Sequence, residues 1–467
     1  MMKQDEKKLV KNTLLLMLGN FSSKLLVFFL VPIYTSVLST TEYATSDLLT
    51  TTINLIYPFA TLMISTAVMR LCLDKCNDSK QLLSIGTWIE IIGIVLIAII
   101  SQFFFNEGAL QGYREYFLAG FAGYSFYTLL MEYAKGSERV GMYSFAGVCN
   151  TIVLISCNII FLIHWKMGIK GYLLAIILSY WITIVILFVG CQAWKDVILP
   201  YRIKRDYVKD MLSYSIPLMP NSISWWISNY SDRYIMNIFR GLNELGIYSV
   251  SYKIPSIMAT ISAILISAWE MSAVDDFGSE RSRRFFSKVY DLWVHVYIIV
   301  CVILVFLVKF LAYILFQKEF FIAWKFVPIL LFASVFSGLS SFLGTVFTAA
   351  KKTKSVFVTT MLGAGINIVL NLMLIPFCGG YGAAVATALG YLATYFSRLI
   401  GANKIIYLDV NYKEHFVKFS ALFLMVIASC ADNWNNYILG FLILFLERDF
   451  IMVIIKNFVC RLSRKSS

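Results

Sequence analysis

The sequence predicts an all-α integral membrane protein with about fourteen transmembrane helices. We expect two pseudo-symmetric six-helix bundles around a central cavity, followed by two C-terminal helices. Of the 467 residues 59% are hydrophobic and 14% are charged, and the mean hydropathy is +0.74, values outside the range of soluble domains. Apolar runs long enough to cross a bilayer recur between short polar loops. Two long segments also share one polar pattern, which indicates an internal repeat.

The positions of the spans follow from the apolar runs. The start MMKQDEKKLVK is basic, but the run after it is too long for a cleaved signal peptide and is expected to be retained as the first span. The last run, ending before Glu447, is short, and an amphipathic cytoplasmic helix is expected to follow it. The expected spans are residues 13–37, 45–72, 83–105, 116–134, 142–164, 171–193, 213–239, 246–271, 289–316, 325–350, 355–377, 381–403, 415–432 and 434–447.

Lysine and arginine gather in alternate loops, and this distribution predicts the orientation of the chain. The net charge of +13 alone would also suit a nucleic-acid-binding protein. However, the basic loops include 195–210, 351–354 and 404–418 together with both termini, as the positive-inside rule requires. We therefore expect a multi-pass protein of the bacterial cytoplasmic (inner) membrane with both termini in the cytoplasm. Its basic side is expected to contact anionic membrane lipids, and no nucleic-acid partner is expected.

The first span carries a lysine near the middle of the bilayer. Lys24 lies about 13 residues, or roughly 20 Å along a helix, beyond Lys11. A side chain that snorkels to the interface is one interpretation, but neither headgroup layer is easily reached from this depth. Asn20 lies one turn away. Because a charge at this depth is costly, we expect both residues to face an internal cavity.

Polar residues in three further spans recur at helical spacing, which places each set on one helix face. The second span begins at Asp47, its polar set continues through Asn54 to Ser65, and the span ends with Arg70 at the inner interface. The set in the seventh span is Asn221, Ser224, Ser228 and Asp232, next to Arg233. The set in the eighth span is Ser249, Lys253, Ser256, Thr260 and Ser267. We expect these faces to point away from lipid.

The two halves of the chain align with each other. A shift of 202 residues places Asp47 on Ser249, and a shift of 211 places Gly168 on Gly379. Because each repeat unit holds six spans, the two units are expected to have the same orientation, related by an axis along the membrane normal. The expected domains are an N-terminal six-helix bundle (1–195), a basic cytoplasmic linker (196–210), a second six-helix bundle (211–406), and two further spans with an amphipathic tail (407–467).

Motifs of several enzyme classes are absent from the sequence. It has no Walker A, HExxH, GxSxG or EF-hand motif, and its nine cysteines include no CxxC pair. We therefore expect no catalytic residue, metal site or cofactor, and the chain is not expected to be an enzyme. The cysteines are expected to be buried as small apolar residues.

One segment carries a resemblance to a known family. The stretch LNLMLIPFCGGYGAAVATALGY (370–391), preceded by AAKKTK, resembles the signature of the oligosaccharide flippases of the polysaccharide transport family, within the multidrug, oligosaccharidyl-lipid and polysaccharide exporter superfamily. FLVPIYTSVLSTTEY (29–43) and SDRY with GIYSVSYK (231–253) are further matches. A departure is Ala44-Thr45-Ser46, where the family more often has a Gly-Leu-Tyr-like sequence.

The resemblance implies a flippase that carries undecaprenyl-diphosphate-linked oligosaccharide repeat units from the cytoplasmic to the outer leaflet by alternating access. The product would serve O-antigen, capsule or exopolysaccharide assembly, with a polysaccharide polymerase and chain-length proteins as partners. Fixed cations and hydroxyls in a cavity can replace the water around a diphosphate. A cation-coupled multidrug exporter of the same superfamily and a peptidoglycan lipid-precursor flippase remain alternatives.

The candidate site residues divide into two sets. Those expected along the substrate pathway are Lys24, Lys253, Arg70, Arg233, Asn20, Asn54, Ser256 and Trp225. Trp225 offers an aromatic platform for a sugar, although core packing or an interfacial belt explains a tryptophan equally well. Those available for coupling to an H⁺ or Na⁺ gradient are Asp47, Asp232 and Glu90.

Overall fold

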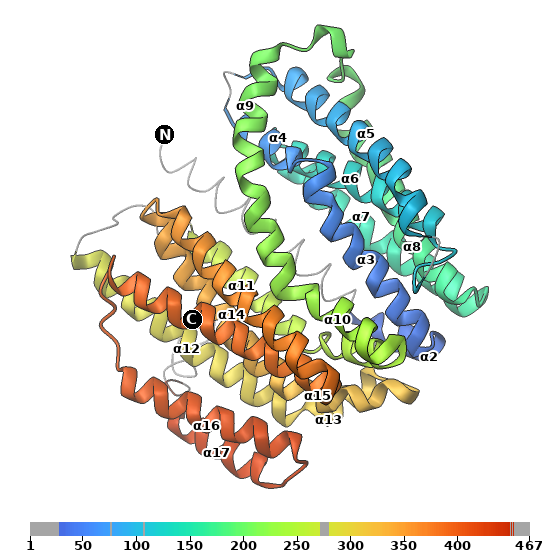
Figure 1. The fold of residues 1–467 in the computed structure, drawn as a ribbon. Coiled ribbons are helices and arrows are strands. Elements are labelled where there is room, and N and C mark those ends of the chain that lie inside the picture. The colour runs from blue at the N-terminus through green and yellow to red at the C-terminus, as the bar shows by residue number, and fades with distance from the viewer. Residues whose placement is uncertain are drawn as a thin grey trace, which may run out of the picture. The chain divides into compact units, whose positions relative to one another are not determined.

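The computed structural model describes residues 28–74, 77–105, 108–270 and 280–448, together with 450 and 452 (Figure 1). Residues 13–27 of the expected first span, with Asn20 and Lys24, lie outside these residues. Within them, every regular element is a helix, as the fold class predicted. The α-helices are α2 Val31–Val37, α3 Thr40–Ala60, α4 Ile64–Cys72, α5 Ser79–Phe104, α6 Arg114–Gly136, α7 Val140–Asn158, α8 Gly168–Gly190, α9 Arg205–Ser215, α10 Met219–Ser251, α11 Pro255–Glu270, α12 Glu280–Phe306, α13 Val308–Leu315, α14 Val327–Ala349, α15 Thr353–Asn403, α16 Tyr412–Cys430 and α17 Asn435–Leu446. The shorter helical segments are η1 Ile159–His164, η2 Ala193–Lys195, η3 Pro200–Arg202, η4 Ile216–Leu218 and η5 Lys318–Lys325.

The helices have the length and surface of membrane spans. Six described helices are long and apolar enough to cross a bilayer, and eight are if each strongly bent pair counts as one span. On α5, a stripe of large apolar side chains at helical spacing is exposed, and this is the surface that lipid covers. The stripe consists of Ile92, Val95, Leu96, Ile99 and Phe103. The chain is therefore a multi-pass membrane protein, and every expected span after the first overlaps a described helix.

The cysteines correct one expectation. Of the seven that the structure describes, Cys191 and Cys301 are buried, Cys378 is exposed and the other four are partly exposed. A thiol behaves as a small apolar group, and in a membrane helix such a group can face lipid as well as the protein interior. Apolar character in this chain therefore does not imply burial.

The contacts between helices divide the chain into two units. Unit 1 comprises Met1–Ser249 with Leu315–Phe320, and unit 2 comprises Val250–Ile314 with Phe321–Ser467. These boundaries differ from those of the predicted repeat, because nearly all of α10 packs with the first unit. The division at 196–210 stays a prediction from the sequence pattern.

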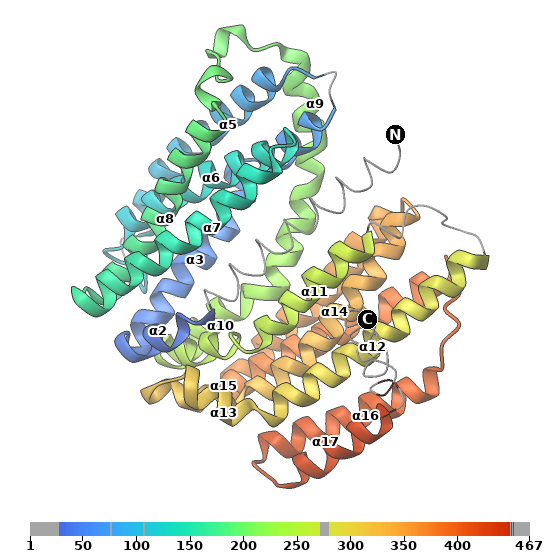
Figure 2. The same cartoon turned by 180° about the vertical axis from the view of Figure 1, so that it is seen from behind.

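Each unit is built around one central helix. In unit 1, α6 contacts α3, α4, α5, α7 and α8, and the last three lie beside it in Figure 2. In unit 2, α14 contacts α11, α12, α15 and α16. These two helices coincide with the fourth span of each predicted repeat, residues 116–134 and 325–350. The same position in the two repeats therefore supplies the core helix of each unit.

Two glycines that the repeat equates both have a positive φ. Gly168 at the start of α8 has φ +56°, and Gly379 within α15 has φ +52°. This left-handed region is strained for other residues. Gly379 divides α15 into two helices, which match the predicted spans 355–377 and 381–403. The shift of 211 residues thus aligns two glycines with similar positive φ.

Two breaks shape the helices that carry the polar faces. The chain bends by 64° between α3 and α4, where Leu62 and Met63 have positive φ, shortly after Pro58 has removed a backbone donor. In α10 the helix is interrupted at Gly241, which has φ +82°. The segments before and after Gly241 can therefore point in different directions.

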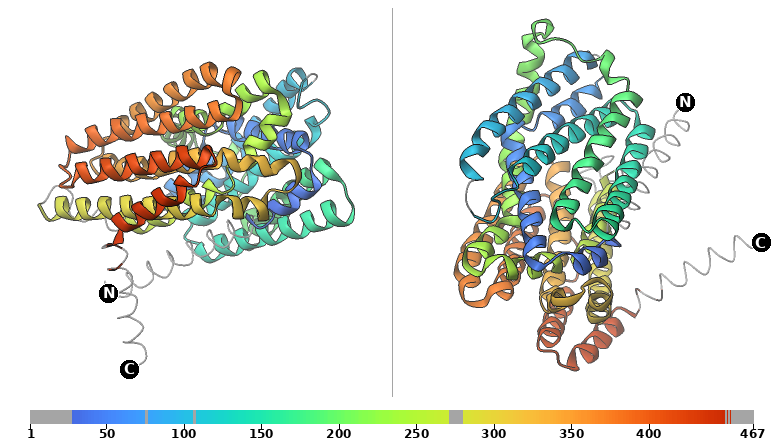
Figure 3. Two further views of the ribbon diagram at one scale, coloured as in Figure 1. Left: turned by 90° about the horizontal axis from the view of Figure 1, so that it is seen from below. Right: turned by 90° about the vertical axis from the view of Figure 1, so that its right-hand side faces the viewer.

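The two C-terminal helices form an antiparallel pair. Helices α16 and α17 pack against each other, and both contact α12. Figure 3 shows this pair in red beside the yellow α12. They are the additional spans that the sequence predicted beyond the twelve helices of the repeat.

Candidate functional site

An ionic cluster in unit 1 joins α3 to both segments of α10. Arg233 Nε donates to Asp47 Oδ2 at 2.7 Å, and Arg233 Nη1 donates to Asp232 Oδ1 at 3.2 Å. Arg233 and Asp232 are buried, whereas the Asp47 side chain is 23% exposed. Two candidate coupling residues and one candidate pathway residue are thus brought together.

The segment beyond Gly241 completes the cluster. Tyr248 Oη donates to Asp232 Oδ2, and Ser249 Oγ donates to Asp47 Oδ2, each at 2.7 Å. These bonds exist because α10 turns at Gly241 and brings its last turn back to the carboxylates. The Arg233 guanidinium also lies over the ring of Tyr230, 4.8 Å from its centroid. Both carboxylates therefore have a cation and a hydroxyl donor before any substrate arrives.

The serine hydroxyls of the seventh span donate hydrogen bonds to backbone carbonyls of their own helix. Ser224 Oγ donates to the carbonyl of Pro220, and Ser228 Oγ donates to that of Ser224. Such bonds to the preceding turn are the usual solution for hydroxyls in helices. Of the predicted polar face, Asn221 is exposed, the two serines bond to their own helix and Asp232 bonds to Arg233.

Glu90, on α5, differs from the other two carboxylates. Its side chain is fully buried, and neither carboxylate oxygen has a hydrogen-bond partner among the described residues. Its polar neighbours are Ser125 on α6 and Tyr57 on α3, and the Tyr57 hydroxyl is already bonded to Ser65 at 2.8 Å. An ionised carboxylate in such a place costs several kcal/mol unless a proton or another cation neutralises it.

The remaining candidates of unit 1 differ from this cluster in their exposure. Arg70 at the end of α4 is exposed, and Asn54 on α3 is partly buried. Trp225 is 55% exposed, whereas its neighbour Trp226 is buried and donates through Nε1 to the carbonyl of Thr51 at 3.0 Å. The platform role of Trp225 stays a prediction, and Trp226 is a core residue.

Two candidates belong to unit 2. Lys253 is partly buried at the start of the eighth span, and the exposed Ser256 donates to its carbonyl at 2.6 Å. The pathway roles of these residues, and of Asn20 and Lys24 outside the described part, stay predictions from the sequence.

A basic pocket in unit 2 is lined by lysines of the loops 351–354 and 404–418. The sequence pattern had used these loops only to predict the orientation of the chain. Lys352, Lys354 and Lys404 line a cavity of about 450 Å³ between α14 and the two ends of α15. The other lining residues are apolar or hydroxyl-bearing, and none is acidic: Phe347, Ser355, Val358, Thr359, Ser397, Gly401 and Ile405. The pocket offers positive charge to an anion, whereas the hydroxyls of Thr359 and Ser397 donate to carbonyls of their own helix.

A second ionic network holds the C-terminal pair to α12. Lys418 Nζ on α16 contacts Glu414 Oε1 at 2.7 Å and Glu447 Oε1 at 3.1 Å. His295 on α12 binds the other oxygen of Glu447, and its Nε2 lies 3.4 Å from Asp291 Oδ2. His295 thus belongs to a mostly buried network that the sequence pattern did not predict. The spacing of Glu414 and Lys418, one turn apart in an apolar span, was the signal that could have revealed it.

The comparisons with known proteins agree with this architecture. Exposed apolar helices around buried ionic clusters define a polytopic membrane protein. A family model described as polysaccharide biosynthesis protein matches residues 9–269, and the chain belongs to that family. A second model, MatE, matches residues 217–373.

Solved structures share the fold at low sequence identity. A structure described as the lipid II flippase MurJ in an inward closed conformation has TM-score 0.70 at 14% identity, covering 94% of this chain and 99% of that one. An inward-facing multidrug resistance MATE family transporter of the MOP superfamily has TM-score 0.64 at 15% identity, covering 85% and 95%. A MOP superfamily transporter from Pyrococcus furiosus has TM-score 0.56 at 14% identity, covering 88% and 95%. With the two family models, these matches give the chain the fold of the MOP superfamily.

One curated relative was also found. An uncharacterized membrane protein of Methanocaldococcus jannaschii is 24% identical over 212 residues, which is 43% of this chain. The match spans 41% of that relative's length.

Proposed function

We propose that this protein is a flippase for polyprenyl-diphosphate-linked oligosaccharides. It moves the saccharide from the cytoplasmic to the outer leaflet by alternating access, and the saccharide then enters O-antigen, capsule or exopolysaccharide assembly. Membership in the polysaccharide biosynthesis protein family supports a glycan product. The likeness in fold to the MurJ structure, described as a lipid II flippase, supports a lipid-linked cargo.

The basic pocket is the observation that carries the proposal. Its three lysines come from loops that the positive-inside rule assigns to the cytoplasm, where a lipid-linked precursor is loaded. A diphosphate presents several anionic oxygens, and charge-assisted hydrogen bonds to ammonium groups compensate for part of its lost water. Ser355, Thr359 and Ser397 add hydroxyls next to them. A cationic drug would be repelled from the same surface.

The multidrug alternative needs a carboxylate that is available to a cation. Asp47 and Asp232 are already bound to Arg233. Glu90 is the candidate that remains, and we assign it to coupling: its buried carboxyl exchanges a proton as the helices around it rearrange. This gives the flippase a coupling ion without a cationic substrate.

The proposal can be tested by reconstituting the protein in liposomes with lipid-linked oligosaccharides extracted from a strain that lacks it. The double variant Lys354→Ala/Lys404→Ala should slow translocation at least about tenfold, the effect of losing roughly 1.4 kcal/mol of headgroup binding. Lys166→Ala/Lys170→Ala, which removes two exposed lysines from a loop of the opposite predicted side, is the matched control.

A deletion strain gives an independent readout. We expect undecaprenyl-linked repeat units to accumulate, surface polysaccharide to be lost and viability to be kept. Lethality would instead indicate a peptidoglycan-precursor flippase. Cationic dye efflux without any loss of polysaccharide would favour the multidrug exporter and refute the proposal.

A further inference from the structure

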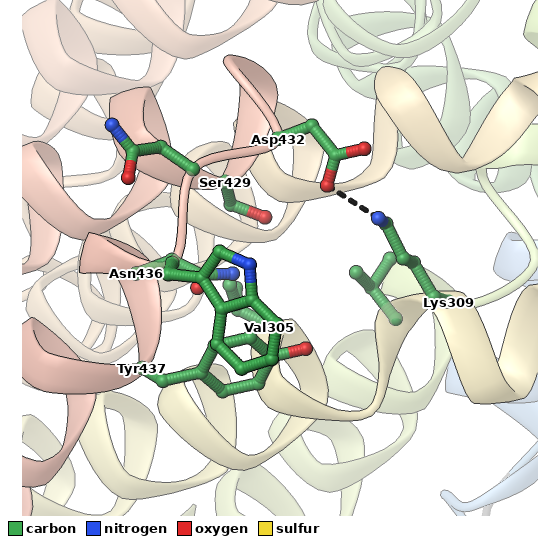
Figure 4. A pocket seen from close by; sticks show the side chains of 9 residues that line it. Val305, Lys309, Ser429, Asp432, Asn436 and Tyr437 are labelled. Carbon is green, nitrogen blue, oxygen red and sulfur yellow. Dashed lines mark hydrogen bonds and ion pairs between the residues drawn. The ribbon is translucent and has the colours of Figure 1, made fainter.

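A small pocket in unit 2 lies where α12 and α13 meet the turn between α16 and α17. It has a volume of about 250 Å³, near the lower end of the range for ligand pockets, about 300–1,000 Å³, so it suits a single ring. Its lining residues are Val305, Val308, Lys309, Ser429, Asp432, Asn433, Trp434, Asn436 and Tyr437. In Figure 4, Lys309 and Asp432 form an ion pair on one side of the pocket, and Asn436 and Tyr437 lie on the other. The predicted topology places this turn on the outer side of the membrane.

Two buried polar atoms of the pocket have no partner. Ser429 is 2% exposed and Asn436 is 8% exposed, yet Ser429 Oγ and Asn436 Oδ1 make no hydrogen bond to any described residue. Leaving such a buried atom unpaired destabilises the folded protein. Both side chains line the same cavity, so a ligand with hydroxyl groups entering it would satisfy them together.

Aromatic rings form another part of the wall. Trp434 is 81% exposed, and its ring centroid lies 5.8 Å from that of Tyr437. Phe306 stacks on Tyr437, with the two ring centroids 5.7 Å apart and an interplanar angle of 23°. An interfacial aromatic belt explains an exposed tryptophan, but it does not explain the two unpaired polar atoms beside it.

The ion pair completes the set of groups. Lys309 and Asp432 are both about half exposed, so their attraction adds little stability. Lys309 contacts Asp432 Oδ1 and also lies over the ring of Trp324 at 4.8 Å. Asp432 Oδ2 makes no hydrogen bond within the described residues, and a carboxylate oxygen is a strong acceptor for hydroxyl groups.

We infer that this pocket binds one sugar ring of a saccharide. The apolar C–H face of the ring packs on Trp434 and Tyr437, while its hydroxyls bind Ser429, Asn436 and Asp432. Aromatic faces combined with amide, hydroxyl and carboxylate groups fit a molecule that is apolar on its faces and polar around its edge. The site is separate from the basic pocket and from the residues assigned to coupling. It does not depend on the proposed transport activity.

The test is saturation-transfer difference NMR on the full-length protein in neutral-lipid nanodiscs. The probes are free N-acetylglucosamine, glucose, galactose and rhamnose, with glycerol phosphate and inorganic phosphate in separate arms. At least one sugar should bind the wild type saturably in the millimolar range, about 1 mM corresponding to a weak single-ring site. Trp434→Ala should weaken that binding at least about tenfold. Trp165→Ala, which removes a tryptophan of unit 1 that is 60% exposed, should leave it unchanged.

A second variant separates binding from folding. Asn436→Leu should also weaken sugar binding, yet its melting temperature should be equal to or above that of the wild type, because the substitution removes a buried unpaired atom. The inference is overturned if no sugar binds, or if Trp434→Ala binds sugar as the wild type does. Saturable binding of phosphate without any sugar would also overturn it, since Lys309 would then mark an anion site.

Discussion

Ser249 Oγ donates a 2.7 Å hydrogen bond to Asp47 Oδ2, the same oxygen that accepts from Arg233 Nε. The two residues are 202 positions apart, which is the shift that aligns the polar faces of the two halves. One carboxylate oxygen thus joins α3 to α10 on both sides of Gly241. The cluster therefore holds α3 against both segments of α10 within unit 1, and its contribution to stability can be tested directly.

Asp47→Ala should lower the free energy of unfolding by about 2 kcal/mol, because it removes hydrogen bonds to a buried cation and to Ser249. Ser249→Ala should lower it by about 1 kcal/mol. The measurement is the melting temperature in detergent. The double variant Asp47→Ala/Arg233→Met should be more stable than the sum of the single changes, since it no longer leaves a buried cation short of a partner. Simple additivity would show that the pair is not coupled.

The helices were predictable, but their partners were not. Apolar runs located the spans, and Gly379 was correctly assigned to a boundary between two of them. The seventh span is helical, as its polar spacing predicted. The helical period alone cannot show that Asp232 is bound by Tyr248 and Arg233. The bond from Tyr248 depends on how α10 turns at Gly241. The position of Arg233 depends on its contact with Asp47, 186 positions away.

The partners of Glu447 in the C-terminal network were also not predictable from the sequence. Glu447 was treated only as the residue that ends an apolar run, because its partners lie far away in sequence. His295 is 152 residues from it. A buried carboxylate must find a cation, so its presence in an apolar run indicated that a partner exists, but not which one.

Gly246→Ala should separate α3 from α10. A Cβ at this position would lie 2.0 Å from the carbonyl oxygen of Thr40, and backbone on both sides must move to relieve the overlap. We expect a loss of at least about 2 kcal/mol, comparable to overpacking of a core, and a fall in the yield of folded protein. Gly365→Ala, in a helical position where a Cβ meets nothing within 4 Å, is the control and should be neutral or stabilising. Equal stability of the two variants would contradict the close approach.

Lys418→Met should weaken the attachment of α16 and α17 to α12. Lys418 and Glu447 are almost fully buried, and removing one partner of such a pair costs about 3–5 kcal/mol. Glu414→Gln removes a partner whose side chain is 49% exposed, and its effect should be much smaller. Limited proteolysis in the segment between α15 and α16 gives the readout, with faster cleavage expected for Lys418→Met. The double variant Lys418→Met/Glu447→Gln should recover protection, and failure to do so would mean that lost packing, rather than lost charge, causes the effect.

Glu90→Leu should stabilise the protein and abolish its coupling. The substitution removes two buried oxygens that have no hydrogen-bond partner among the described residues, so the melting temperature should rise by an amount that corresponds to about 1–3 kcal/mol. If Glu90 carries the coupling proton, translocation in liposomes should lose its stimulation by an imposed pH gradient while keeping the rate measured without one. Glu132→Gln, a partly buried acid on the neighbouring α6, should keep the stimulation. A stabilised Glu90→Leu that still responds to the gradient would assign coupling to another group. A destabilised variant would show that this carboxyl has a structural partner outside the described residues.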